Sequence, residues 1–135
     1  MRIIYEFHGW ATIHETTTEA DAGNLDSIVK KIQRFISELN WSSGLLEVYP
    51  ANGNYHLSVG GFLNRKTSEA EEVIKLYQFI ADNSSGSYGV LYTRDDEDTE
   101  GYENNFRVFV LARGNIQLKE DEFLSPFVPG VEDNE

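Results

Sequence analysis

The sequence contains no cysteine, three prolines and only 11 basic residues among its 135 residues. The absence of cysteine excludes disulfide bonds, thiolate zinc sites and cysteine nucleophiles. No apolar run approaches the roughly 18 residues that a membrane-spanning helix requires, and the acid at Glu6 comes too early for a secretory signal peptide. A chain of this length typically forms one domain that buries a core without cross-links. We therefore expect a single domain over residues 1–135, soluble and cytoplasmic.

The scarcity of bases leaves a large excess of acids. The 11 bases stand against 23 acids, so the formal net charge is −12. Nucleic acid is a poor partner for such a chain, because its phosphates must be met by a basic patch. Residues 95–135 hold twelve acids and three bases, a net charge of −9, with five acids in the six positions 95–100. A charge run of this kind is either a solvated loop or an electrostatic landing site for a cationic partner.

The first half of the chain predicts a strand, a helix and a hairpin. Residues 2–14 alternate in a period of two, which is typical of a half-buried strand, here with its odd-numbered positions in the core. Apolar residues at helical spacing predict an amphipathic helix over residues 25–40, with Gly44 as its C-terminal cap. Asn52-Gly53 predicts a tight turn that joins two short strands, at residues 45–49 and 55–62.

The second half predicts another helix and further strands. A helix is expected from Ser68 to about residue 81, followed by strands over residues 87–94 and 105–112. The strand over residues 105–112 is apolar on both faces, which favours a central position in a sheet, and a weaker strand follows at residues 116–119. The acidic tail, about residues 120–135, is expected to dock and then fray, anchored by Phe123, Leu124, Phe127 and Val128.

The expected order is therefore β-α-β-β-α-β-β, followed by the tail. Helices that alternate with hairpins, rather than with single strands, indicate an α+β fold. We predict a mainly antiparallel sheet of about five to six strands with two helices on one face, similar in order to the split β-α-β plan.

Nothing in the sequence predicts a metal, a cofactor or a catalytic site. His8 and His14 share a strand face but lie about 20 Å apart at about 3.3 Å per residue, too far to hold one ion. Residues 95–101 lack the ligand spacing and the twelfth-position Glu of a calcium loop. No Gly-x-Ser-x-Gly nucleophile motif is present. We therefore expect no cofactor and no enzymatic activity.

Aromatic residues point instead to protein binding. Trp10 falls on the predicted polar face of the first strand, where it is either half-buried under a helix or an exposed anchor. Tyr102 lies inside the acidic run and is hard to explain as a core residue. Tyr and Trp dominate the energetics of protein interfaces. Arg94, next to Asp95 and Asp96, is expected to hold the base of the acidic run through an exposed ion pair of about 0–1 kcal/mol.

Four segments resemble the immunity protein 7 family of bacterial polymorphic toxin systems. They are YEFHGWATI at residues 5–13, LYTRDDED at 91–98, FRVFVLARG at 106–114 and DEFLSPFVP at 121–129, with a Glu-Asp pair at 132–133. They occur in the family's order at both ends of the chain, whereas residues 15–85 match in general pattern only.

The resemblance implies a non-catalytic cytoplasmic protein that binds and blocks the C-terminal toxin domain of a contact-dependent or related effector. Because nuclease toxins bind phosphates in basic clefts, an inhibitor of net charge −12 fits a cationic RNase or DNase blocked at its active site. The residues that we expect to contact the toxin are the following eight: Asp95, Asp96, Glu97, Asp98, Glu100, Tyr102, Glu103 and Trp10.

Three alternatives remain open at this point. The chain is an acidic interaction adaptor without a toxin partner, or a small enzyme with an unrecognised buried carboxylate pair, or a mimic of DNA. A DNA mimic needs acids spread along an elongated face, whereas the cluster here is local. The oligomeric state is left undecided by one sequence.

Overall fold

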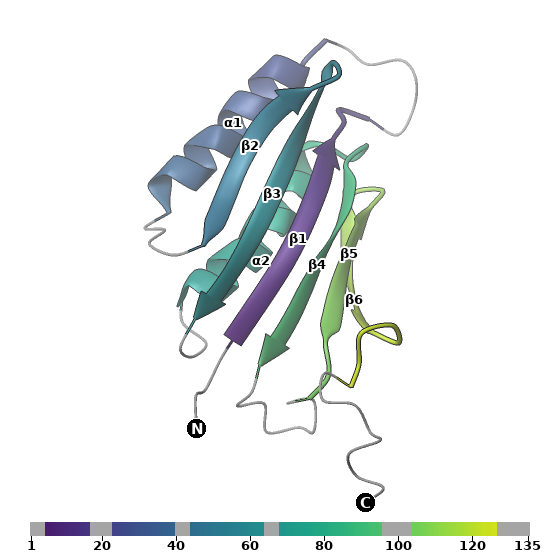
Figure 1. Ribbon diagram of the computed structural model, residues 1–135. Helices are drawn as coiled ribbons and strands as arrows, with labels where there is room; N and C mark the ends of the chain where they lie inside the picture. Colours follow the sequence, from purple (N-terminus) through teal and green to yellow (C-terminus); the bar gives the residue numbers. More distant parts are fainter. Residues whose placement is uncertain (1–4, 17–22, 40–43, 64–67, 96–103, 127–135) are drawn as a thin grey trace, which may run out of the picture.

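The computed structural model describes residues 5–16, 23–39, 44–63, 68–95 and 104–126 (Figure 1). Two helices and six strands follow one another in the order β-α-β-β-α-β-β-β. The α+β fold class, the two helices and the antiparallel sheet are confirmed. The elements are β1 (Tyr5–Ile13), α1 (Leu25–Glu38), β2 (Leu45–Ala51), β3 (Asn54–Leu63), α2 (Ser68–Asn83), β4 (Tyr88–Asp95), β5 (Arg107–Ala112) and β6 (Asn115–Glu120).

The strands form one antiparallel sheet in the order β2-β3-β1-β4-β5-β6. The first strand of the chain is thus a central strand, paired with β3 on one side and with β4 on the other. As the two apolar faces of β5 predicted, this strand is internal, because the weakly predicted β6 pairs with it over six positions. The weaker strand predicted at residues 116–119 is thus observed as β6, and it adds one element to the expected order β-α-β-β-α-β-β.

Both helices cover the same face of the sheet, as predicted, and they lie behind it in Figure 1. The odd-numbered side chains of β1 form the core with them, which confirms the predicted core face of this strand. Burying such side chains stabilises the fold by about 25 cal/mol per Å² of apolar surface. The largest fully buried side chains come from both helices and four strands: Tyr77, Phe7, Ile13, Ile32, Leu57, Leu76, Ile80, Leu91 and Leu111.

Two tight turns close the hairpins at the sheet's ends. Asn52 and Gly53 both have positive φ, 54° and 80°, the backbone of the turn that Asn-Gly favours between twisted strands. The β5–β6 hairpin uses the same geometry at Arg113 (φ 51°) and Gly114 (φ 76°). Arginine pays a steric cost in this left-handed region that asparagine largely avoids.

Tyr77 of α2 contacts the helix-covered face of the sheet at the position of Gly9. Its hydroxyl lies 2.9 Å from the Val90 carbonyl oxygen and 3.2 Å from the Trp10 carbonyl oxygen, so it donates to the backbone between β1 and β4. A Cβ atom at Gly9 would lie 2.5 Å from this hydroxyl oxygen. Burial raises the pKa of Tyr77, so the hydroxyl remains a donor. The missing side chain of Gly9 therefore makes room for the contact that fixes α2 to the sheet.

Two local predictions are wrong. Helix α1 ends at Glu38 with Leu39 as its C-terminal cap, and Gly44 instead begins the approach to β2 against the backbone of Gly60. The side chains of Phe123 and Leu124 are exposed and do not anchor the tail. The other two predicted anchors, Phe127 and Val128, lie outside the described residues.

The tail is anchored by polar groups instead. The Asp121 carboxylate accepts hydrogen bonds from the backbone N–H groups of Phe123 and Leu124, at 3.1 and 2.7 Å, and from the Ser125 hydroxyl. Ser125 Oγ in turn accepts from the Phe106 N–H, and the Asp121 N–H donates to the Phe106 carbonyl. Burial alone would raise the pKa of Asp121, but these hydrogen bonds outweigh it and lower the pKa below its usual value.

Candidate partner-binding surface

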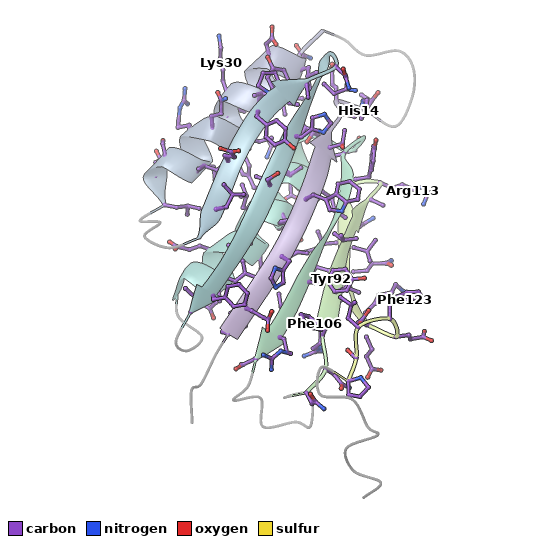
Figure 2. All side chains as sticks on the ribbon, in the orientation of Figure 1. His14, Lys30, Tyr92, Phe106, Arg113 and Phe123 are labelled. Carbon is purple, nitrogen blue, oxygen red and sulfur yellow. The ribbon has the colours of Figure 1, made fainter. Side chains whose placement is uncertain are left out.

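Neither of the described helices covers the face of the sheet opposite them, and this face points toward the viewer in Figures 1 and 2. Since directly paired residues of antiparallel strands share a face, the even-numbered positions of β1 place their partners on this side. We call it the open face. Its side chains come from all six strands: Glu6, His8, Trp10 and Thr12; Leu45, Glu47 and Tyr49; His56, Ser58 and Phe62; Tyr88, Val90, Tyr92 and Arg94; Val108 and Val110; and Gln117 and Lys119.

Large apolar side chains are exposed on the open face. Phe62 is 63% exposed and Trp10 is 47% exposed, and three further large side chains of this face are also exposed, namely Leu45, Tyr49 and Tyr88. Soluble proteins rarely leave neighbouring large apolar side chains uncovered unless the patch binds something. The open face therefore has the composition of an interface, with aromatic residues at its centre.

The rings of this face support one another in two rows, in which Phe106 is buried and the other rings are exposed or half-buried. In the first row Trp10 meets Tyr88 edge-on, with ring centroids 6.0 Å apart, and Tyr88 stacks on His14 at 5.9 Å. In the second row His8 lies between Phe62 and Phe106, at 5.4 and 6.4 Å, and Phe106 continues to Tyr92. Rings fixed by such contacts lose little rotamer freedom when a partner binds, which lowers the cost of association.

A buried ion pair lies beneath the second row. Glu6 and Arg94, each 5% exposed, are directly paired across β1 and β4. Arg94 donates from Nε and Nη2 to Glu6 Oε2, at 3.0 and 2.8 Å, and His8 Nε2 lies 2.8 Å from Glu6 Oε1. The carboxylate thus orients the His8 ring that separates Phe62 from Phe106. The pair fixes the geometry of the aromatic surface from below.

Charge is sparse on the open face. At the paired strand positions of this face, the charged residues are Glu6, Glu47, Arg94 and Lys119, two acids and two bases, and the buried Asp121 follows β6 opposite Phe106. The opposite side of the molecule differs, because the exposed face of α1 carries Lys30, Lys31 and Arg34 beside two shallow hollows. A chain of net charge −12 thus presents an almost neutral aromatic sheet face.

A comparison with protein families decides what kind of protein this is. A family model described as immunity protein 7 matches residues 4–133, nearly the whole chain. The chain belongs to the immunity protein 7 family. It is therefore an immunity protein against a polymorphic toxin, and it binds a cognate toxin. Searches of curated proteins and of solved structures found no match.

Metal-ligating residues do not cluster in the part of the chain that the structure describes. No group of three or more His, Asp or Glu residues there can hold a metal ion. Three carboxylates are buried among the described residues: Glu6 is paired with Arg94, Glu15 accepts from the Asn24 N–H, and Asp121 accepts from the backbone N–H groups of Phe123 and Leu124. None of the described helices is long and apolar enough to cross a membrane. Immunity protein families are in general non-catalytic.

The sequence-predicted toxin-contacting residues are only partly placed. Six of the eight, the acids at 96, 97, 98, 100 and 103 together with Tyr102, lie outside the described residues. Trp10 is on the open face and no helix covers it, so the exposed alternative for this residue is the observed one. Asp95 is the last residue of β4 and pairs with Tyr5, an odd-numbered core position.

Asp95 and Trp10 therefore lie on opposite faces of the sheet, about 17 Å apart along the strands. Burial raises the pKa of Tyr5 to about 12, with a further rise from the nearby Asp95 charge, while a hydrogen bond with Thr93 lowers it. The structure does not bring these two predicted residues together on one surface.

Two further features of the site were missed or mistaken by sequence reasoning. Arg94 is buried and paired with Glu6, rather than forming only an exposed ion pair at the base of the acidic run. Tyr88 and Phe62 belong to the open face but were taken as ordinary strand residues. The pairing register of the strands would have identified both residues, because each shares a sheet face with an even-numbered β1 residue.

Proposed function

We propose that this immunity protein acts in the cytoplasm and neutralises the toxin domain of a contact-dependent or related polymorphic toxin by covering its active site. Membership of the family over residues 4–133 supports toxin binding. The net charge of −12 is the observation from which we infer the chemistry of the partner. We infer that the toxin is cationic.

A cationic nuclease fits this charge best. An RNase or DNase binds phosphates with Lys and Arg in its cleft, and the carboxylates of an acidic inhibitor take the places of those phosphates. A field of this sign also raises the association rate with a basic partner at low salt. Fast association matters for an inhibitor that must reach the toxin before the toxin reaches nucleic acid.

Co-purification with the polypeptide encoded immediately upstream tests the function directly. The immunity protein is expected to form a stable complex with the C-terminal domain of that polypeptide and to restore growth of cells that express it. Failure of both assays excludes the cognate pairing. A neutral or acidic toxin domain that is nevertheless bound and neutralised keeps immunity but contradicts the nuclease proposal.

The acidic run is tested separately. Replacing Asp95, Asp96, Glu97 and Asp98 with Asn or Gln removes four charges without removing side-chain volume. If the run lies on the toxin's cationic cleft, affinity falls and the slope of affinity against salt concentration becomes shallower. Unchanged affinity and slope identify the run as a solvated loop.

A further inference from the structure

We propose that the open face is the surface on which the toxin docks, with Trp10 and Tyr88 as its energetic centre. The inference rests on the proposed function and deepens it, because it moves the main contact from the acidic run to the aromatic sheet face. It also specifies the partner's chemistry: a basic protein surface whose arginine side chains stack on the exposed rings.

The open face exposes aromatic rings that are held in place by their neighbours. Trp10 is half-exposed yet held edge-on by Tyr88, which itself rests on His14. Binding hot spots are enriched in Trp and Tyr at the centre of an interface, where surrounding contacts exclude water. Trp10 also lies on the central strand β1, with neighbours on both sides to supply such contacts.

The open face also differs in charge from the whole molecule. The charged side chains at the paired strand positions of the open face balance, whereas the protein as a whole has a net charge of −12. Interfaces that are not permanent typically combine a centre poor in charge with a charged surround. The long-range field attracts a basic partner, and the neutral rings then receive its apolar and guanidinium groups. Arginine suits this role because it is weakly hydrated and stacks on aromatic rings.

A second copy of the chain is the competing occupant. Face-to-face association would bring together two molecules that each carry a charge of −12, and this repulsion opposes self-association. A basic toxin gains from the same field. Charge therefore favours the toxin over a second copy.

Isothermal titration against an inactivated form of the upstream-encoded toxin domain tests the proposal. Trp10→Ala and Tyr88→Ala are each expected to weaken binding by at least about tenfold, the loss typical of a hot spot. Trp10→Phe keeps a ring and is expected to stay within about threefold of wild type, whereas Trp10→Leu keeps apolar area without a ring and loses at least about tenfold. Phe123→Ala is the matched control, since Phe123 is 88% exposed on the loop after β6, beyond the sheet edge (Figure 2), and its affinity change should stay within about twofold.

Two further measurements make the outcomes of the titration interpretable. Thermal unfolding first establishes that the variants are folded, and hydrogen exchange of the wild-type complex provides a second measurement that needs no variant. Wild-type affinity in folded Trp10→Ala and Tyr88→Ala, or protection confined to the helix side, overturns the docking surface while the proposed function stands. If Trp10→Phe and Trp10→Leu lose the same amount of toxin affinity, the claim that a toxin arginine stacks on the Trp10 ring is wrong. If the wild type does not bind the toxin domain, both proposals fall. A wild-type dimer that Trp10→Ala makes monomeric without loss of toxin affinity assigns the face to a second copy.

Discussion

Arg94 lies directly opposite Glu6 on the neighbouring antiparallel strand and donates two hydrogen bonds to one oxygen of its carboxylate. The other oxygen contacts the His8 ring. Because both charged groups are buried, neither can recover its hydration when the other is removed. We predict that Arg94→Leu or Glu6→Leu lowers the free energy of unfolding by about 3–5 kcal/mol, measured by urea denaturation.

The Glu6→Leu/Arg94→Leu double variant is the control for this pair. Replacing both partners leaves no unpaired buried charge, so its unfolding free energy is expected to lie closer to that of the wild type than to either single variant. Single-variant losses that simply add in the double variant would contradict a direct interaction between the two side chains.

Gly9 and Tyr77 form a second coupled pair. Gly9→Ala places a Cβ atom 2.5 Å from the Tyr77 hydroxyl and 2.7 Å from the Val90 carbonyl oxygen, and we expect a loss of about 1–3 kcal/mol. Tyr77→Phe removes one hydrogen bond from the backbone and is expected to cost about 1 kcal/mol. Since Tyr77→Phe also relieves one of the two clashes, the double variant should lose less than the sum. Additive losses in thermal or urea unfolding count against this contact.

The β5–β6 turn offers a stabilising substitution. Arg113→Asn puts the residue favoured at positive φ into a turn that already has this backbone. We expect the free energy of unfolding to rise by about 0.5–1 kcal/mol. The chain supplies its own control at the β2–β3 turn, where Asn52→Arg reverses the exchange in the same geometry and should destabilise by a similar amount. A change of the same sign in both variants would show that backbone conformation is not the cause.

The Asp121 carboxylate makes stability depend on pH. Its pKa is lowered in the folded protein, so its contribution is present above the unfolded-state pKa of about 3.9 and is lost as the pH falls through the lowered folded value. At pH 7 Asp121→Asn is expected to lose about 1–2 kcal/mol, because the hydrogen bonds to a charge are replaced by weaker ones. Urea denaturation between pH 2 and 7 should show the two proteins converging below about pH 4. A constant difference across that range excludes the ionised carboxylate as the source.

Sequence patterns correctly predicted the helices, strands and turns that are determined by residues close together in the chain. The alternation of β1, the helical spacing of α1 and α2, and the Asn52-Gly53 turn are each determined by neighbours within a few residues, and all are observed. The core face of β1 was also predictable, because alternation separates its two sides. Family resemblance supplied the function class, which periodicity alone does not contain.

What the sequence left open depends on distant pairing. Whether a helix covers Trp10, and whether Arg94 meets Glu6, follow from the order of strands in the sheet, and no local pattern encodes that order. The expectation that Phe123 and Leu124 anchor the tail was wrong because apolar character was weighed above the capacity of Asp121 to accept backbone hydrogen bonds. Polar anchoring of this kind can be predicted only when the strand that the tail binds to is known.

The central place of β1 has a consequence for the newly made protein. Residues 5–13 are synthesised first, but their pairing partners end at residues 63 and 95. At about 5–20 residues per second, β1 waits on the order of 4–16 s after its own synthesis before β4 is complete. A chain that stops between residues 63 and 87 has β3 but lacks β4, the other neighbour of its central strand, and it lacks Tyr88. Docking of the toxin on the open face therefore requires translation to have passed β4, which ends at residue 95.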